Sequence, residues 1–127
     1  RPRVTDTLDT AVRKFQKELN AGTVALVLLA ILERSDAPLY GYQIAKQLEG
    51  AATDGMAVKQ GTLYPVLRSL EAQGLLSSRV EPSVTGPPRK YYAITGEGSA
   101  VLAAWSDVWR RTREFVDGTL EGGRGSR

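Results

Sequence analysis

The side chains with the most evident chemistry lie in the middle of the chain, on one predicted helix. Leu63, Val66, Leu67 and Leu70 recur at helical spacing, so this apolar stripe is expected to face inward. The opposite face then carries hydrogen-bonding and basic side chains: Lys59, Gln60, Thr62, Tyr64 and Arg68. Arginine and glutamine can make bidentate contacts to base edges of DNA, whereas hydroxyls and lysine suit phosphates. An ordinary solvated helix face is the alternative interpretation.

A basic hairpin is predicted directly after this helix. Residues 75–80 and 90–94 have the composition of strands, and the connection over residues 81–89 contains three prolines and a glycine. The charged residues in and beside this connection are Arg79, Glu81, Arg89 and Lys90. A basic hairpin beside a polar helix favours binding of a nucleic-acid backbone. A plain surface hairpin is the other possibility.

The composition excludes several classes of function. The 127 residues carry a net charge of +3 and include no cysteine or histidine. This removes disulfides, the usual zinc ligands and the usual nucleophile–base pairs, so we expect no enzyme, no metal and no cofactor. The charge is uneven, because residues 59–90 hold five basic and two acidic residues, whereas residues 96–121 hold three and five. A basic middle segment is typical of a surface that binds a polyanion.

The elements that must position these residues follow from periodicity. We predict helices over residues 7–19, 23–34 and 39–48, with Asn20 and Gly22 separating the first two. Residues 23–34 are apolar on every side, which predicts a central buried helix. Their apolar stretch is about half of the roughly 20 residues that a membrane span needs. We therefore expect a cytoplasmic protein without a membrane partner.

These elements predict a mainly α fold with a small β-hairpin, in the order of a winged helix-turn-helix. Residues 1–19 are expected to form an N-terminal helical extension and residues 20–95 the DNA-binding domain. Residues 96–121, after a predicted N-cap at Thr95, are expected to form a C-terminal dimerisation helix. Residues 122–127 are predicted to be a disordered tail.

The last helix has an apolar face that is long for one small subunit to cover. The residues expected to form a dimer contact on it are Leu102, Trp105, Trp109, Phe115 and Val116. Trp105 and Trp109 are four residues apart and share a face. Two interpretations stay open and are compatible: the indoles pack in a dimer seam, or they line a cavity for a planar aromatic or nucleotide-like molecule.

Three motifs resemble the PadR family of bacterial transcriptional regulators. They are LYGYQIA at residues 39–45, GTLYPVLRSLEAQGL at residues 61–75 and PRKYYAITGEG at residues 88–98. The resemblance implies a dimeric winged-helix regulator, usually a repressor, that binds double-stranded DNA and is often released by a small molecule. It also places Tyr40 and Tyr42 near phosphate at a helix entrance. Pro87 departs from the family pattern, in which a basic residue often follows the wing glycine.

The sequence therefore predicts a homodimeric repressor of an inverted-repeat operator. A winged-helix module that binds a protein partner and has lost specific DNA binding is the alternative. The Gly96-Glu97-Gly98 run lacks the rest of a nucleotide-binding glycine loop. Tyr91 and Tyr92 alternate across a strand, so one of them is expected in the core.

Overall fold

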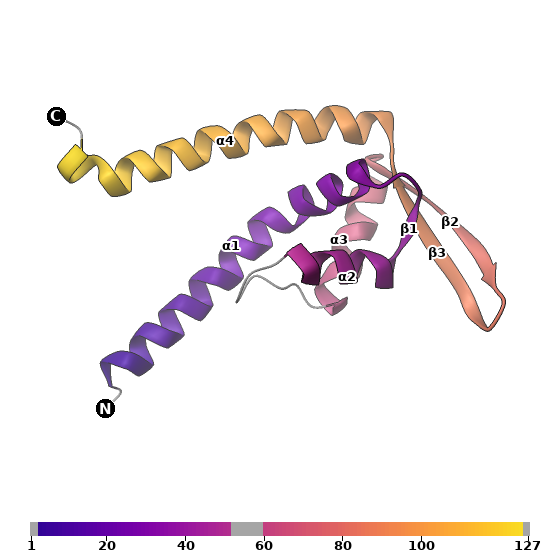
Figure 1. Cartoon of the computed structure of the whole chain (residues 1–127), viewed down its shortest axis with the longest axis horizontal. Helices are drawn as coiled ribbons and strands as arrows, with labels where there is room; N and C mark the ends of the chain where they lie inside the picture. The colour runs from indigo at the N-terminus through magenta and orange to yellow at the C-terminus, as the bar shows by residue number, and fades with distance from the viewer. Residues whose placement is uncertain (1–2, 52–59, 126–127) are drawn as a thin grey trace.

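Four helices and a small antiparallel sheet make up the part of the chain that the computed structural model describes, residues 3–51 and 60–125. In chain order they are α1 (Val4–Arg34), β1 (Leu39–Tyr40), α2 (Gly41–Ala51), α3 (Gln60–Ala72), β2 (Leu76–Ser83), β3 (Gly86–Ile94) and α4 (Gly96–Gly125). The long helices α1 and α4 extend away from the β2–β3 hairpin, and both chain ends lie on that far side (Figure 1). The mainly helical winged fold is confirmed, with one strand more than expected.

The core is built around the second half of α1. Its buried residues are Val24, Leu28, Leu29, Ile31 and Leu32, and α2, α3 and the sheet pack around them. The expectation of a central buried helix over residues 23–34 is therefore confirmed. By length and composition alone α1 could cross a membrane, but these residues form the core of the protein.

The predicted break between two N-terminal helices is wrong. α1 runs without interruption through Asn20 and Gly22, so the expected boundary at residue 20 falls inside a helix. Glycine in a helix costs only about 1 kcal/mol relative to alanine. The Asn20 side chain accepts a hydrogen bond from Gln16 at 2.8 Å, and the Thr23 hydroxyl donates to the Leu19 carbonyl at 3.0 Å. Both polar side chains are thus accommodated within the helix.

The sheet has the strand order β1-β3-β2, and both pairings are antiparallel. Leu39 and Tyr40 pair with β3, so they form a strand rather than the start of the next helix. The hairpin also differs from the prediction, because its strands extend to Ser83 and Gly86 and leave only a short turn. Pro82 lies where the register shifts, in an edge strand where the missing N–H is tolerated.

α4 begins as predicted, with Thr95 as its cap. The Gly98 amide donates to the Thr95 hydroxyl at 3.0 Å, and this hydroxyl donates to the Gly74 carbonyl at 2.7 Å. A Cβ on Gly98 would overlap the Leu75 carbonyl, so this glycine serves close packing rather than nucleotide binding. α4 continues to Gly125, whereas the sequence predicts disorder from residue 122. Residues 126–127 lie outside the described part.

Candidate nucleic-acid interface

The two faces of α3 are those that the apolar stripe predicts. Leu63, Leu67 and Leu70 are fully buried, whereas Thr62 and Arg68 are exposed. Gln60 is the first residue of the helix, and Lys59 lies outside the described residues. α3 thus presents a polar, basic face to solvent while its leucines hold it against the core.

Tyr64 has a structural role as well as an exposed surface. Its ring lies against the backbone of Gly41, where an added Cβ would be 2.6 Å from Cε1 and 2.8 Å from Cζ of the tyrosine. Tyr64 is nevertheless 37% exposed. The start of α2 and the face of α3 can approach this closely only because residue 41 is glycine. This role of Gly41 was not predicted from the sequence, although the Tyr-Gly-Tyr run at a helix start was a usable signal.

A hollow separates α3 from the hairpin, and we call it the α3–wing hollow. It has a volume of about 350 Å³ and is lined by Tyr40, Gly41, Tyr64, Arg68, Pro88, Arg89, Lys90 and Tyr92. The structure therefore brings together Tyr40, Tyr64, Arg68, Arg89 and Lys90 of the predicted DNA-contacting residues. Thr62 and Tyr42 are exposed but do not line this hollow. Three cations in one concave surface make a site suited to phosphate.

The basic residues of the hairpin differ in their partners. Lys90 Nζ lies 3.3 Å from Glu71 Oε1, and the Ser78 hydroxyl donates to Glu71 Oε2 at 2.5 Å. The Ser78 bond, followed by Lys90, holds the pKa of Glu71 below its ordinary value, and the Glu71 carboxylate raises the pKa of Lys90. Arg79 pairs with Glu81 at 2.5 Å. Glu71, whose role was not predicted from the sequence, thus partly neutralises Lys90, one of the predicted phosphate contacts.

The ring of Tyr40 in β1 contacts two other tyrosine rings, Tyr91 of β3 and Tyr42 of α2. The Tyr40 ring lies edge-on to Tyr91, with centroids 5.4 Å apart, and is stacked with Tyr42 at 6.4 Å. The Arg89 guanidinium lies over the Tyr40 ring, 4.5 Å from its centroid. Tyr92 is buried, as expected for one member of the adjacent pair. Tyr40 is thus half-buried among side chains rather than fully open to solvent.

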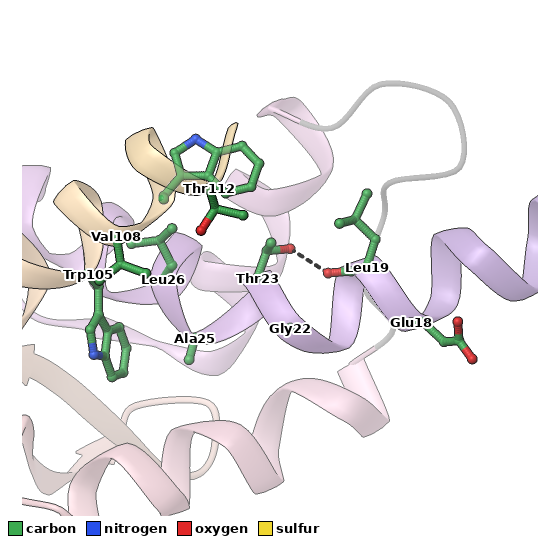
Figure 2. A pocket seen from close by; sticks show the side chains of 10 residues that line it. Glu18, Leu19, Gly22, Thr23, Ala25, Leu26, Trp105, Val108 and Thr112 are labelled. Atoms are coloured by element: carbon green, nitrogen blue, oxygen red, sulfur yellow. Dashed lines mark hydrogen bonds between the residues drawn. The ribbon is translucent and has the colours of Figure 1, made fainter. Parts of the chain in front are cut away.

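A second hollow lies between α1 and α4 and has a volume of about 460 Å³. Figure 2 shows Leu19, Thr23 and Leu26 of α1 together with Trp105, Val108 and Thr112 of α4. Trp109 also lines this hollow and is 40% exposed. Trp105 and Leu102 are half-buried and pack against the core of their own chain. Among the described residues, no cluster of three or more metal-binding side chains is present.

The N-terminal half of α1 and the part of α4 from Val108 onward expose apolar side chains. We define this outer apolar surface by its members, which are Val4, Leu8, Val12, Phe15, Val108, Phe115, Val116 and Leu120. Phe115 is 73% exposed and Leu120 77%. Extended apolar surface of this kind is uncommon on soluble monomers and marks an interaction site.

Comparison with known proteins agrees with this geometry. The model of the transcriptional regulator PadR-like family matches residues 28–104. The chain is 37% identical over 92 residues to the transcriptional regulator Rv3488 of Mycobacterium tuberculosis, covering 72% of this chain and 76% of that protein. It is 29% identical over 102 residues to the transcriptional regulator YqjI of Escherichia coli, covering 80% of this chain but only 44% of that protein.

Solved structures show the same relationship. The crystal structure of a PadR family transcriptional regulator from Eggerthella lenta has a TM-score of 0.79 and 36% sequence identity, over 91% of this chain and 96% of that chain. The family consists of transcriptional regulators, which confirms the expectation that the chain is not an enzyme. The motifs, the winged fold and these matches together show that the chain belongs to the PadR-like family of transcriptional regulators.

Proposed function

We propose that this regulator is a homodimeric repressor that binds an inverted-repeat operator, with α3 in the major groove and the β2–β3 hairpin on the backbone. The α3–wing hollow carries the proposal, because it joins Arg68 of the helix to Arg89 and Lys90 of the hairpin. Arg68 is exposed on the face that would meet base edges. A repressor of this kind acts in the cytoplasm, where it can bind the chromosome.

The outer apolar surface supports a dimer of this kind. A second copy would cover apolar side chains of both α1 and α4. The two α3 helices would then contact half-sites about 34–36 Å apart, one turn of the duplex. Of the predicted dimer residues, Trp109, Phe115 and Val116 are available for this contact, whereas Leu102 and Trp105 pack mainly within their own chain.

We also infer an effector site in the hollow between α1 and α4. Its volume of about 460 Å³ suits a small ligand, and the indoles of Trp105 and Trp109 would stack on a planar aromatic or nucleotide-like molecule. Titration of such compounds should quench Trp fluorescence. The response should be lost in Trp109→Ala if this indole contacts the ligand.

The main test selects genomic DNA fragments with the purified protein and then maps the bound sites by footprinting. Arg68→Ala should weaken binding to the selected operator by about 1–3 kcal/mol and reduce discrimination between sequences. Arg113→Ala is the control, because Arg113 lies on α4 and pairs with Asp117 at 3.5 Å. Selection of no specific fragment would favour the protein-interaction module instead.

A further inference from the structure

The two neighbouring cations of β3 both lie over tyrosine rings, but only one of them makes an ion pair. Lys90 lies 5.4 Å from the centroid of the Tyr92 ring and is paired with the Glu71 carboxylate. Arg89 lies over the Tyr40 ring, 4.5 Å from its centroid, and makes no ion pair with any acid in residues 3–51 and 60–125. The residue paired with Arg89 across the hairpin is Glu81, but this carboxylate binds Arg79. Arg89 therefore keeps its full charge for an external anion.

Tyr40 is fixed before any ligand arrives. Its backbone pairs with Tyr91 in the sheet, and its amide donates to the Gln43 side chain at 3.0 Å. The ring is edge-on to Tyr91 and stacked with Tyr42. A ring held on two sides is a rigid platform, and a guanidinium lying over its face is attracted by the ring without being neutralised.

We propose that Tyr40 is a positioning residue that holds the Arg89 guanidinium toward the DNA phosphates, rather than a residue that contacts phosphate through its own hydroxyl. An exposed arginine loses much rotamer freedom when it is fixed on a ligand. The platform restricts that freedom in advance. This inference rests on the proposed DNA binding and assigns a role within it.

The test separates the ring of Tyr40 from its hydroxyl. Binding to a duplex of unrelated sequence is measured against NaCl concentration for the wild type, Arg89→Ala, Tyr40→Leu, Tyr40→Phe and the Tyr40→Leu/Arg89→Ala double variant. Arg89→Ala should lower the salt slope by about one. Tyr40→Leu should weaken binding about two- to fivefold, and Tyr40→Phe should restore it. In the Arg89→Ala background, Tyr40→Leu should have no further effect.

Two outcomes would overturn the proposal. Equal loss in Tyr40→Phe and Tyr40→Leu would assign the contact to the hydroxyl. An undiminished effect of Tyr40→Leu without Arg89 would show that the two residues act independently. If Tyr40→Leu does not fold, Tyr40→Trp is compared with Tyr40→Phe, because both keep an aromatic face without the hydroxyl. Both should then bind as the wild type does, and a loss of binding in both would reject the proposal.

The free protein gives a reading that does not depend on DNA binding. The Arg89 side-chain protons should show an upfield ring-current shift by NMR in the wild type and in Tyr40→Phe, but not in Tyr40→Leu. An unshifted Arg89 in the wild type would reject the platform itself. If the Arg89 protons show this shift but the protein binds no duplex, the proposed DNA binding is rejected. The contact between Arg89 and Tyr40 is then still supported.

Discussion

Around the α3–wing hollow, the apolar side chains that support the surface are covered by the chain itself, whereas the outer halves of α1 and α4 leave theirs uncovered. Leu67 of α3, next to Arg68 in the chain, has no exposed surface, but Leu120 on α4 is 77% exposed. The first region therefore differs from the second mainly in the burial of its apolar side chains. The second region leaves large apolar side chains exposed to solvent, which is uncommon on soluble monomers.

The largest change in stability should come from a substitution in the buried apolar residues of α3. Leu67→Ala removes a fully buried side chain and should lower the free energy of unfolding by about 2–5 kcal/mol, measured by urea denaturation of the isolated subunit at low concentration. Leu120→Ala is the matched control and should leave that free energy almost unchanged. Similar losses in both variants would contradict the distinction between the two regions.

A charge on the outer apolar surface should act on assembly rather than on folding. Phe115→Asp should raise the dimer dissociation constant about 100-fold, because an aspartate would be buried without a partner in the contact. Analytical ultracentrifugation measures this change, and circular dichroism checks that the helices persist. If Phe115→Asp remains dimeric to the same degree as Arg113→Ala, this part of α4 does not form the contact.

The shape of the α3–wing hollow can be changed by a substitution that leaves its charged residues in place. Gly41→Ala places a methyl group against the Tyr64 ring and should cost about 1–3 kcal/mol, divided between folding and DNA affinity. Gly50→Ala in the same helix is the control, since nothing lies within 4 Å of a Cβ at that position. Equal DNA affinity and stability in the two variants would show that the contact between Gly41 and Tyr64 is unimportant.

The smallest effect concerns the Glu71–Lys90 pair. Because the pKa of Glu71 is lowered on folding, the carboxylate stabilises the protein at neutral pH, and this stabilisation is lost as the pH falls through the lowered value. Glu71→Gln should therefore be less stable than the wild type at pH 7, on the order of 0.2–1 kcal/mol. The gap should close at low pH. A gap that is constant with pH would indicate a lost hydrogen bond instead.

The same variant makes a second, opposite prediction for binding. Without the carboxylate, Lys90 is free to meet phosphate, so Glu71→Gln should bind duplex DNA more tightly at low salt. Glu97→Gln, at the start of α4, is the control and should bind as the wild type does. Weaker binding by Glu71→Gln would mean that the ion pair orients Lys90 for DNA instead of competing with it.

The faces of α3 could be predicted because leucines at helical spacing leave only one side available to the core. The alternation of Tyr91 and Tyr92 follows equally simply from strand geometry. The break in α1 was predicted wrongly because asparagine and glycine are weak breakers, and burial of residues 24–32 outweighs their cost.

Contacts between elements were not predictable in the same way. The Glu71–Lys90 pair joins α3 to β3, and the Arg89–Tyr40 contact joins β3 to β1. Neither is visible without the strand register. The hairpin was predicted too short because its prolines were assigned to a loop. Pro82 lies in the edge strand β2, and Pro87 and Pro88 lie in β3 beyond the residues that pair with β1.

The continuity of α1 also has a mechanical consequence. The N-terminal end of this helix extends away from α2 and α3, and its C-terminal end lies close to them (Figure 1). The first end belongs to the outer apolar surface, and the second is buried in the core. A helix of 31 residues is about 46 Å long, so a tilt of about 5° at one end moves the other by about 4 Å. This displacement is close to the 3.4 Å rise between base pairs. In the proposed dimer, a small change in the angle at which the N-terminal end of α1 packs against the partner would displace its other end. The neighbouring α3 would then shift along the DNA by about one base-pair step.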